Sequence, residues 1–267
     1  MAHGTGGKAV KNPSMVRSLF SGGLVTVIAL ISLALFAWPL LIGVHNTQQS
    51  NLAQTVFMLL MPVLVALVLL EFSSGGIDAR QIALLGVLIA LNSVVRMLGA
   101  GTAGIETSFF LILIGAYAFG SAFGYLLGAG SLMVSALLTG GVGPWLPFQM
   151  MAAGLLGIAA GALPRPTAKR LQVWVLIVFA VVGSYLYGGL MTLWNWPFLA
   201  GTGTSISYVA GAGLLENLTR FLSFETVTGG LLWDTGRAFT TSVLVWLTAP
   251  TLLATLQRAA RRAGYQR

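Results

Sequence analysis

Long stretches without a charged residue constrain this chain most strongly. Residues 18–70, 107–164, 171–215 and 238–257 contain no Asp, Glu, Lys or Arg, and residues 81–95 form a shorter run of the same kind. Only 7% of the 267 residues are charged, whereas soluble domains average about 25%. Because so few charges cannot cover a surface in water, we predict an all-α integral membrane protein.

Eight membrane-spanning helices are predicted by dividing these runs where polar residues, glycine or proline interrupt them. The polar stretch 45–51 splits the first run, and Gly120 and the segment 140–144 split the second. The expected spans are 20–44, 54–71, 82–98, 105–119, 121–139, 146–163, 171–193 and 231–256. The apolar stretch 24–44 is longer than the apolar region of a usual secretory signal, so we expect an uncleaved first span.

The basic residues orient these spans, because cytoplasmic segments of membrane proteins carry an excess of Lys and Arg. With the N-terminus in the cytoplasm, only Arg96, Arg220 and Arg237 fall on the outer side. Eleven basic residues fall on the inner side: Lys8, Lys11, Arg17, Arg80, Arg165, Lys169, Arg170, Arg258, Arg261, Arg262 and Arg267. Seven spans would move the basic C-terminal tail outside. We therefore predict eight spans with both termini cytoplasmic, in the plasma membrane.

The sequence offers few groups for catalysis. It contains no cysteine, and its two histidines, His3 and His45, fall in the N-terminal tail and in an outer loop. It has neither a His-Glu-x-x-His motif nor a Walker A motif. We therefore predict that the chain is not an enzyme, holds no metal and no cofactor, and leaves any use of ATP to partner subunits. The basic residues do not cluster on a polar module, so nucleic acid is not an expected partner.

Polar and aromatic residues gather near the predicted outer side of the membrane. The candidate substrate-binding residues are Arg96, Glu106, Trp145, Gln149, Trp194, Asn195, Trp233, Asp234 and Arg237. Aromatic walls with a few polar groups are typical of a small-molecule pocket, which here would open outward. Two pairs have a simpler interpretation, because Asp234 with Arg237, and Arg96 with Glu106, could each form a salt bridge.

Residues 194–230 form a long outer segment that is not a span. A short surface helix is predicted around 214–222, with Glu216 and Arg220 four residues apart and able to pair. The segment is interpreted either as a lid over a binding site or as an interfacial belt of Trp and Phe.

Small residues recur at a spacing of four, which lets helices approach closely in lipid. We interpret Gly120, Gly124 and Gly128, and also Gly157 with Gly161, as packing surfaces within the chain. The face with Gly86 and Ala90 is the best candidate for docking another membrane subunit.

Several of these segments resemble S components, the substrate-capturing subunits of energy-coupling factor (ECF) vitamin transporters. The resemblance rests on residues 106–110 and 115–128, on the turn 139–150, and on the Trp-Asp-x-x-Arg-Ala motif at 233–238. The last two are similar to actinobacterial-type members, and most similar to those assigned to cobalamin.

The resemblance implies a six-helix core over residues 80–257. The spans within 20–71 are additional, and 1–19 and 258–267 are cytoplasmic tails. It also implies capture of a vitamin from outside, and partners that comprise a transmembrane coupling subunit and two cytoplasmic ATPase subunits. Ala83, Gly86 and Ala90 on the first core helix are the implied docking residues.

Three other functions remain open from the sequence. A stand-alone secondary transporter would commonly show internal repeats and ionisable groups near mid-membrane. A lipid-modifying enzyme would need a nucleophile, a base or a metal site. A purely structural subunit would need none of these features.

Overall fold

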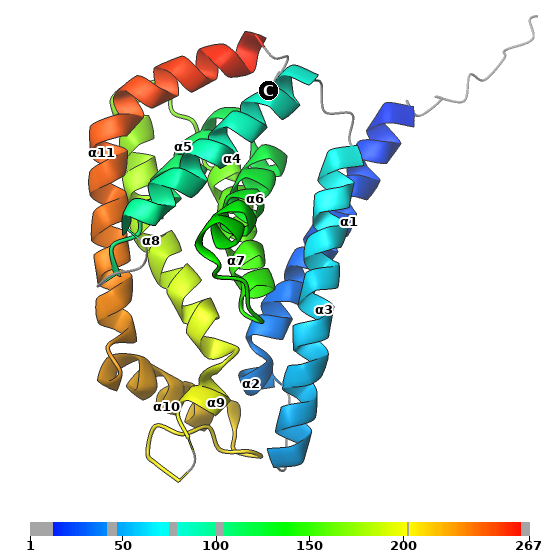
Figure 1. The fold of residues 1–267 in the computed structure, drawn as a ribbon, viewed down its shortest axis with the longest axis vertical. Coiled ribbons are helices and arrows are strands. Elements are labelled where there is room, and N and C mark those ends of the chain that lie inside the picture. The colour runs from blue at the N-terminus through cyan, green and yellow to red at the C-terminus, as the bar shows by residue number, and fades with distance from the viewer. Residues whose placement is uncertain (1–12, 42–46, 75–78, 100–103, 202, 263–267) are drawn as a thin grey trace, which may run out of the picture.

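A computed structural model describes residues 13–41, 47–74, 79–99, 104–201 and 203–262, and within these ranges every regular element is a helix (Figure 1). The helices are α1 (Pro13–Phe36), α2 (Trp38–Leu41), α3 (Thr47–Ser74), α4 (Ala79–Gly99), α5 (Phe109–Phe119), α6 (Ser121–Thr139), α7 (Leu146–Ala162), α8 (Lys169–Leu193), α9 (Trp196–Leu199), α10 (Leu214–Val227) and α11 (Gly230–Arg262). The predicted tail residues Lys8, Lys11 and Arg267 lie outside the described residues, as do His3 and His45.

Eight of these helices overlap the eight predicted apolar segments, but the first predicted span, 20–44, is interrupted at Ala37, where α1 ends before α2, and residues 42–44 lie outside the described residues. Four of them, α4, α6, α8 and α11, are long and apolar enough to cross a membrane within the described residues. Four shorter apolar helical stretches are described at Thr26–Phe36, Met58–Glu71, Phe109–Phe119 and Leu146–Ala162. The prediction of an all-helical membrane protein is therefore confirmed.

The centre of the bundle is built on close contact between α6 and α7. A Cβ atom on Gly157 would lie 2.1 Å from the carbonyl oxygen of Gly124, and one on Gly128 would lie 2.4 Å from that of Ala153. Gly161 meets the backbone at Ser121 in the same way. These glycines therefore bring the two backbones together, and the prediction that they pack within the chain is confirmed.

Glycines also end the helices at the predicted breaks. Gly140 has a φ of 68°, in the left-handed region, and its N–H donates to the carbonyl of Ala136, which closes the C-terminus of α6. Gly120, with a φ of 111°, is the single residue between α5 and α6. Because α5 contains only 11 residues, residues 104–108 must enter the bundle as irregular backbone. Such backbone is tolerated at membrane depth where protein surrounds it, and Ser108 is fully buried.

The two additional N-terminal helices lie side by side along one flank of the bundle (Figure 1). The short helix α2 follows α1 and fixes its C-terminal end to the bundle, because the fully buried Trp38 donates from Nε1 to the carbonyl oxygen of Trp194 at 2.8 Å. Phe36 packs edge-on against Phe148 of α7, with ring centroids 5.6 Å apart. The additional helices therefore share a hydrophobic core with the rest of the bundle.

A second, smaller hydrophobic core lies at the opposite end of the molecule from the end of α11 (Figure 1). It contains Leu193, Trp196, Phe221 and Phe224, which join the end of α8 to α9 and α10. The predicted surface helix is present as α10, and Arg220 Nη2 lies 3.0 Å from Glu216 Oε1. The predictions of a short helix and of a Glu216–Arg220 pair are thus confirmed. The helix packs on the bundle through the second hydrophobic core.

Candidate functional site

Asp234 and Arg237 form a buried ion pair on the first turns of α11. Arg237 Nη1 donates to Asp234 Oδ1, and also approaches the carbonyl oxygen of Ser184 in α8 at 3.4 Å. Both residues are at most 9% exposed. The predicted pairing is confirmed, and it holds a guanidinium inside the bundle, where a charge without a partner would be costly.

Glycines in neighbouring segments make room for this pair. A Cβ atom on Gly188 of α8 would lie 1.8 Å from Asp234 Oδ1, so only glycine lets the carboxylate rest against the α8 backbone. Gly104 has a φ of 77°, and a Cβ atom there would lie 2.3 Å from the carbonyl oxygen of Trp233. The segment that precedes α5 therefore lies against the start of α11, beside the ion pair.

Two aromatic rings cover the guanidinium of Arg237. Its Cζ lies 5.2 Å from the ring centroid of Tyr187 and 5.8 Å from that of Phe109. The two rings meet edge to face, with centroids 4.7 Å apart. A cation over aromatic faces is stabilised by the ring quadrupoles, and more strongly where water is excluded. The site therefore contains a cation lined by aromatic rings, and its residues come from α5, α8 and α11.

Several polar atoms around this pair have no hydrogen-bond partner among the described residues. They are Arg237 Nε, Ser184 Oγ and Thr241 Oγ1. Buried polar groups are nearly always hydrogen-bonded in folded proteins, and each exception calls for an explanation. The polar groups of a bound solute would supply the missing partners.

Glu225 brings a further carboxylate to the site from α10. It is 3% exposed, and a Cβ atom on Gly230 would lie 1.9 Å from its Oε2. Burial raises the pKa of the Glu225 carboxyl above its usual range, the Asp234 carboxylate adds to the rise, and the Thr192 hydroxyl and Arg237 oppose it. The proton on Glu225 is therefore linked to the packing of α10 onto the bundle.

The Glu225→Gln variant is expected to have a flatter dependence of stability on pH than the native chain. A carboxyl whose pKa is raised by folding destabilises the folded state as pH rises from the ordinary glutamate pKa to the raised one. Near neutral pH we expect the variant to melt about 2–4 °C higher than the native chain, the shift for roughly 1 kcal/mol.

Thermal melting of the purified protein between pH 4 and 8 measures this effect. Glu216→Gln is the matched control, because Glu216 lies on the same helix but is exposed and paired with Arg220. Identical pH slopes for the native chain and Glu225→Gln would contradict the prediction.

Arg96 and Glu106 lie nearby but do not pair with each other. Arg96 Nη1 donates to Ser135 Oγ at 3.0 Å. Glu106 Oε1 accepts from the N–H of Ser108 at 3.1 Å and from its hydroxyl at 2.7 Å. The salt bridge considered for Arg96 and Glu106 is therefore absent, and each of the two side chains is held by a serine instead.

Trp194 lies in the shared core rather than on an open wall. Its ring stacks on Phe148 with centroids 3.9 Å apart and an interplanar angle of 8°. It is 5% exposed, and its Nε1 has no hydrogen-bond partner in the described structure. Phe36 of α1 contacts Phe148, and Trp38 of α2 contacts Trp194. The N-terminal helices therefore pack against this stacked pair of rings.

The other four predicted residues are more dispersed. Trp145 and Trp233 are 48% and 45% exposed, and the ring of Trp145 covers Gly143 in the turn before α7. Gln149 and Asn195 are half-buried. The exposed rings of Trp145 and Trp233 therefore lie on the surface of the protein rather than in its core.

The structure adds residues that the sequence interpretation missed. Tyr187 and Phe109 are single aromatics within apolar runs, and no spacing distinguishes them from ordinary core residues. Glu225 did carry a signal, because it falls on the same face of α10 as the buried residues Asn217, Phe221 and Phe224. An acidic residue on the apolar face of an amphipathic helix is rarely buried unless it has a function or a partner.

The candidate docking residues lie on an open face of α4. Ala83, Gly86 and Ala90 are exposed, whereas Leu88, Asn92 and Ser93 on the other face are buried. A Cβ atom on Gly86 would meet nothing within 4 Å. Ala83, Gly86 and Ala90 are called the small-residue face below, and all three are exposed in the described structure.

Comparison with known proteins identifies the class. The family model described as "ECF transporter, substrate-specific component" matches residues 80–246, which is more than half of the chain. The chain therefore belongs to this family of membrane transporter components. The match begins where the six-helix core was predicted to begin, and α1–α3 precede it. No curated protein and no solved structure matched the chain.

Proposed function

We propose that this chain is the subunit of an ATP-driven ECF importer that captures a vitamin or similar micronutrient at the outer face of the plasma membrane. Membership of the substrate-specific component family carries the proposal. The buried Asp234–Arg237 pair and its aromatic cover support it, because a polar cluster with unpartnered atoms is suited to bind a small polar molecule. Cobalamin is the first ligand to test, since residues 139–150 and 233–238 resemble members assigned to it.

The proposed topology has eight spans and two cytoplasmic termini. It is supported by the excess of basic residues on one side and by the observation that α1 begins, and α11 ends, at the same end of the molecule (Figure 1). In this orientation α9, α10 and the Asp234–Arg237 pair lie at the outer end. The second hydrophobic core fastens α10 over the pair, so α10 acts as the lid, and its movement admits the ligand.

In the proposed mechanism, Arg96, Glu106, Gln149, Asn195, Asp234 and Arg237 orient the ligand by hydrogen bonds, and Trp145, Trp194 and Trp233 supply apolar contact. The loaded subunit docks through the small-residue face to a transmembrane coupling subunit that works with two cytoplasmic ATPase subunits. The chain itself uses no cofactor, and ATP is consumed only by the partners.

Native mass spectrometry of the detergent-purified chain tests ligand capture. We expect one bound small molecule to be released from the protein, or a mass shift of one ligand on addition of a vitamin from a panel that includes cobalamin. The ligand should protect the native chain from thermal unfolding, because it binds the folded state. The absence of any adduct across the panel would overturn the proposal and favour a structural or enzymatic membrane protein.

A further inference from the structure

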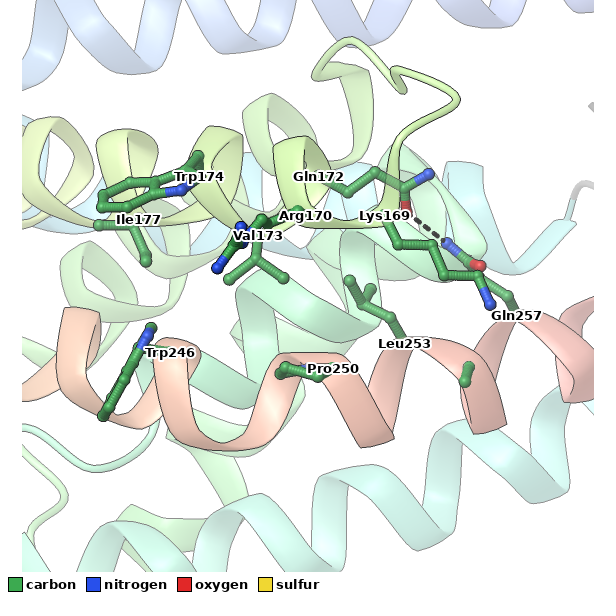
Figure 2. A pocket seen from close by; sticks show the side chains of 11 residues that line it. Lys169, Arg170, Gln172, Val173, Trp174, Ile177, Trp246, Pro250, Leu253 and Gln257 are labelled. Atoms are coloured by element: carbon green, nitrogen blue, oxygen red, sulfur yellow. Dashed lines mark hydrogen bonds between the residues drawn. The ribbon is translucent and has the colours of Figure 1, made fainter.

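A cavity of about 730 Å³ lies between α8 and α11, far along both helices from the Asp234–Arg237 pair. Figure 2 shows Trp174 and Ile177 of α8 facing Trp246 and Pro250 of α11 across it. The two tryptophans are 56% and 62% exposed, so they border the opening of the cavity on the protein surface. Since both helices are membrane-spanning candidates, the opening faces the hydrocarbon of the bilayer.

The shape of α11 explains why the helices separate here. Pro250 lies inside α11 and has no N–H to donate to the carbonyl of Trp246, so the helix bends (Figure 1). On one side of the cavity, Gly188 lets α8 contact Asp234 directly. On the other side, Gln257 Nε2 donates to Gln172 Oε1 at 3.3 Å. The cavity therefore lies between two contacts that join α8 to α11, one at Gly188 and Asp234 and the other at Gln172 and Gln257.

The end of the cavity near the hydrogen-bonded glutamines is positively charged. Lys169 and Arg170, the first residues of α8, both line it, and its lining contains no acidic residue. Neither cation forms a salt bridge within the described ranges, whereas Arg220 and Arg237 do. The first turn of α8 also has no acidic residue and no side-chain cap, so the helix dipole adds to the positive potential.

We propose that this cavity is a binding site for an anionic phospholipid, with its phosphate on Lys169 and Arg170 and an acyl chain between Trp174 and Trp246. The charges require an anionic group, and the apolar groove open to the bilayer requires a hydrocarbon chain beside it. Basic pockets between transmembrane helices on the cytoplasmic side bind such headgroups. Under the topology proposed above, Lys169 and Arg170 lie at that side. The site is separate from solute capture and does not depend on the identity of the captured solute.

Native mass spectrometry and thermal melting of the full chain in detergent, with phosphatidylglycerol or phosphatidylcholine added, test this site. We expect phosphatidylglycerol adducts and a higher melting temperature, and little effect of phosphatidylcholine. Lys169→Gln with Arg170→Gln should weaken phosphatidylglycerol binding about 30-fold, the effect of two cations at an anionic lipid surface. Arg261→Gln with Arg262→Gln removes the same charge from the nearby end of α11, outside this cavity, and should bind as the native chain does.

A second variant tests the acyl-chain part of the site and keeps both cations. Ala254→Phe should fill the cavity that Ala254 lines and reduce phosphatidylglycerol binding, while glycerol phosphate without acyl chains should not protect the native chain. Three results would overturn the proposal: equal binding of the two lipids, an equal loss in the Arg261 and Arg262 control, or native binding in the Lys169 and Arg170 variant. Because each measurement is made without vitamin, failure here would leave the proposed function untouched.

Discussion

Under the proposed function, replacing Arg237 with glutamine is expected to weaken ligand binding by about 10- to 150-fold, the range for loss of hydrogen bonds to a charged group. Arg237 is the one guanidinium that Asp234, Tyr187 and Phe109 hold in a fixed orientation. Its Nε has no partner among the described residues and is free to donate to a ligand. Titration of the purified chain with the vitamin that native mass spectrometry identifies measures the loss.

The same substitution also leaves Asp234 buried and without its ion-pair partner, which destabilises the fold by about 3–5 kcal/mol. The double variant Asp234→Asn with Arg237→Gln separates the two effects, because it replaces the pair by two neutral amides that can bond to each other. We expect the double variant to regain most of the melting temperature and none of the affinity. Recovery of both would show that Arg237 serves only to neutralise Asp234.

The helices were predictable from the sequence because the bilayer imposes strong and simple requirements. A charge-free run of sufficient length can do little except span or line a membrane, and each of the eight predicted segments contains a helix. The short α5 departs from the simplest expectation, since the span predicted at 105–119 begins with irregular backbone and becomes helical only at Phe109. Its burial depends on neighbours far along the chain, which the sequence of the segment does not reveal.

The candidate site was predictable only in part. Charged residues near membrane depth are rare enough to be noticed singly, so Asp234, Arg237, Arg96 and Glu106 were identified. Tyr187 was missed because its role comes from lying beneath a guanidinium on another helix. Trp145 and Trp233 illustrate a second difficulty. Aromatic residues are common at membrane interfaces as well as in binding sites, and composition does not distinguish these two roles.

Gly157→Leu is expected to abolish the folded state of the core. A Cβ atom at this position would meet the backbone of Gly124 at 2.1 Å, and backbone, unlike a flexible side chain, cannot rotate away. Overpacking in a core typically costs about 1–3 kcal/mol, and here we expect more, since α6 and α7 must move apart along their whole contact. Loss of a cooperative melting transition and aggregation during size-exclusion chromatography would register the effect; native behaviour would contradict the contact.

Gly86→Leu makes the same chemical change on α4 and should give the opposite result. Nothing lies within 4 Å of a Cβ atom at Gly86, so the variant should melt as the native chain does and bind vitamin normally. The larger side chain would nevertheless protrude from the small-residue face, where close helix approach to another subunit requires small residues. We therefore expect the coupling subunit to be lost on co-purification from the native host, and uptake to fall with it. Retained co-purification would mean that the open face of α4 serves contact with lipid and that docking occurs elsewhere.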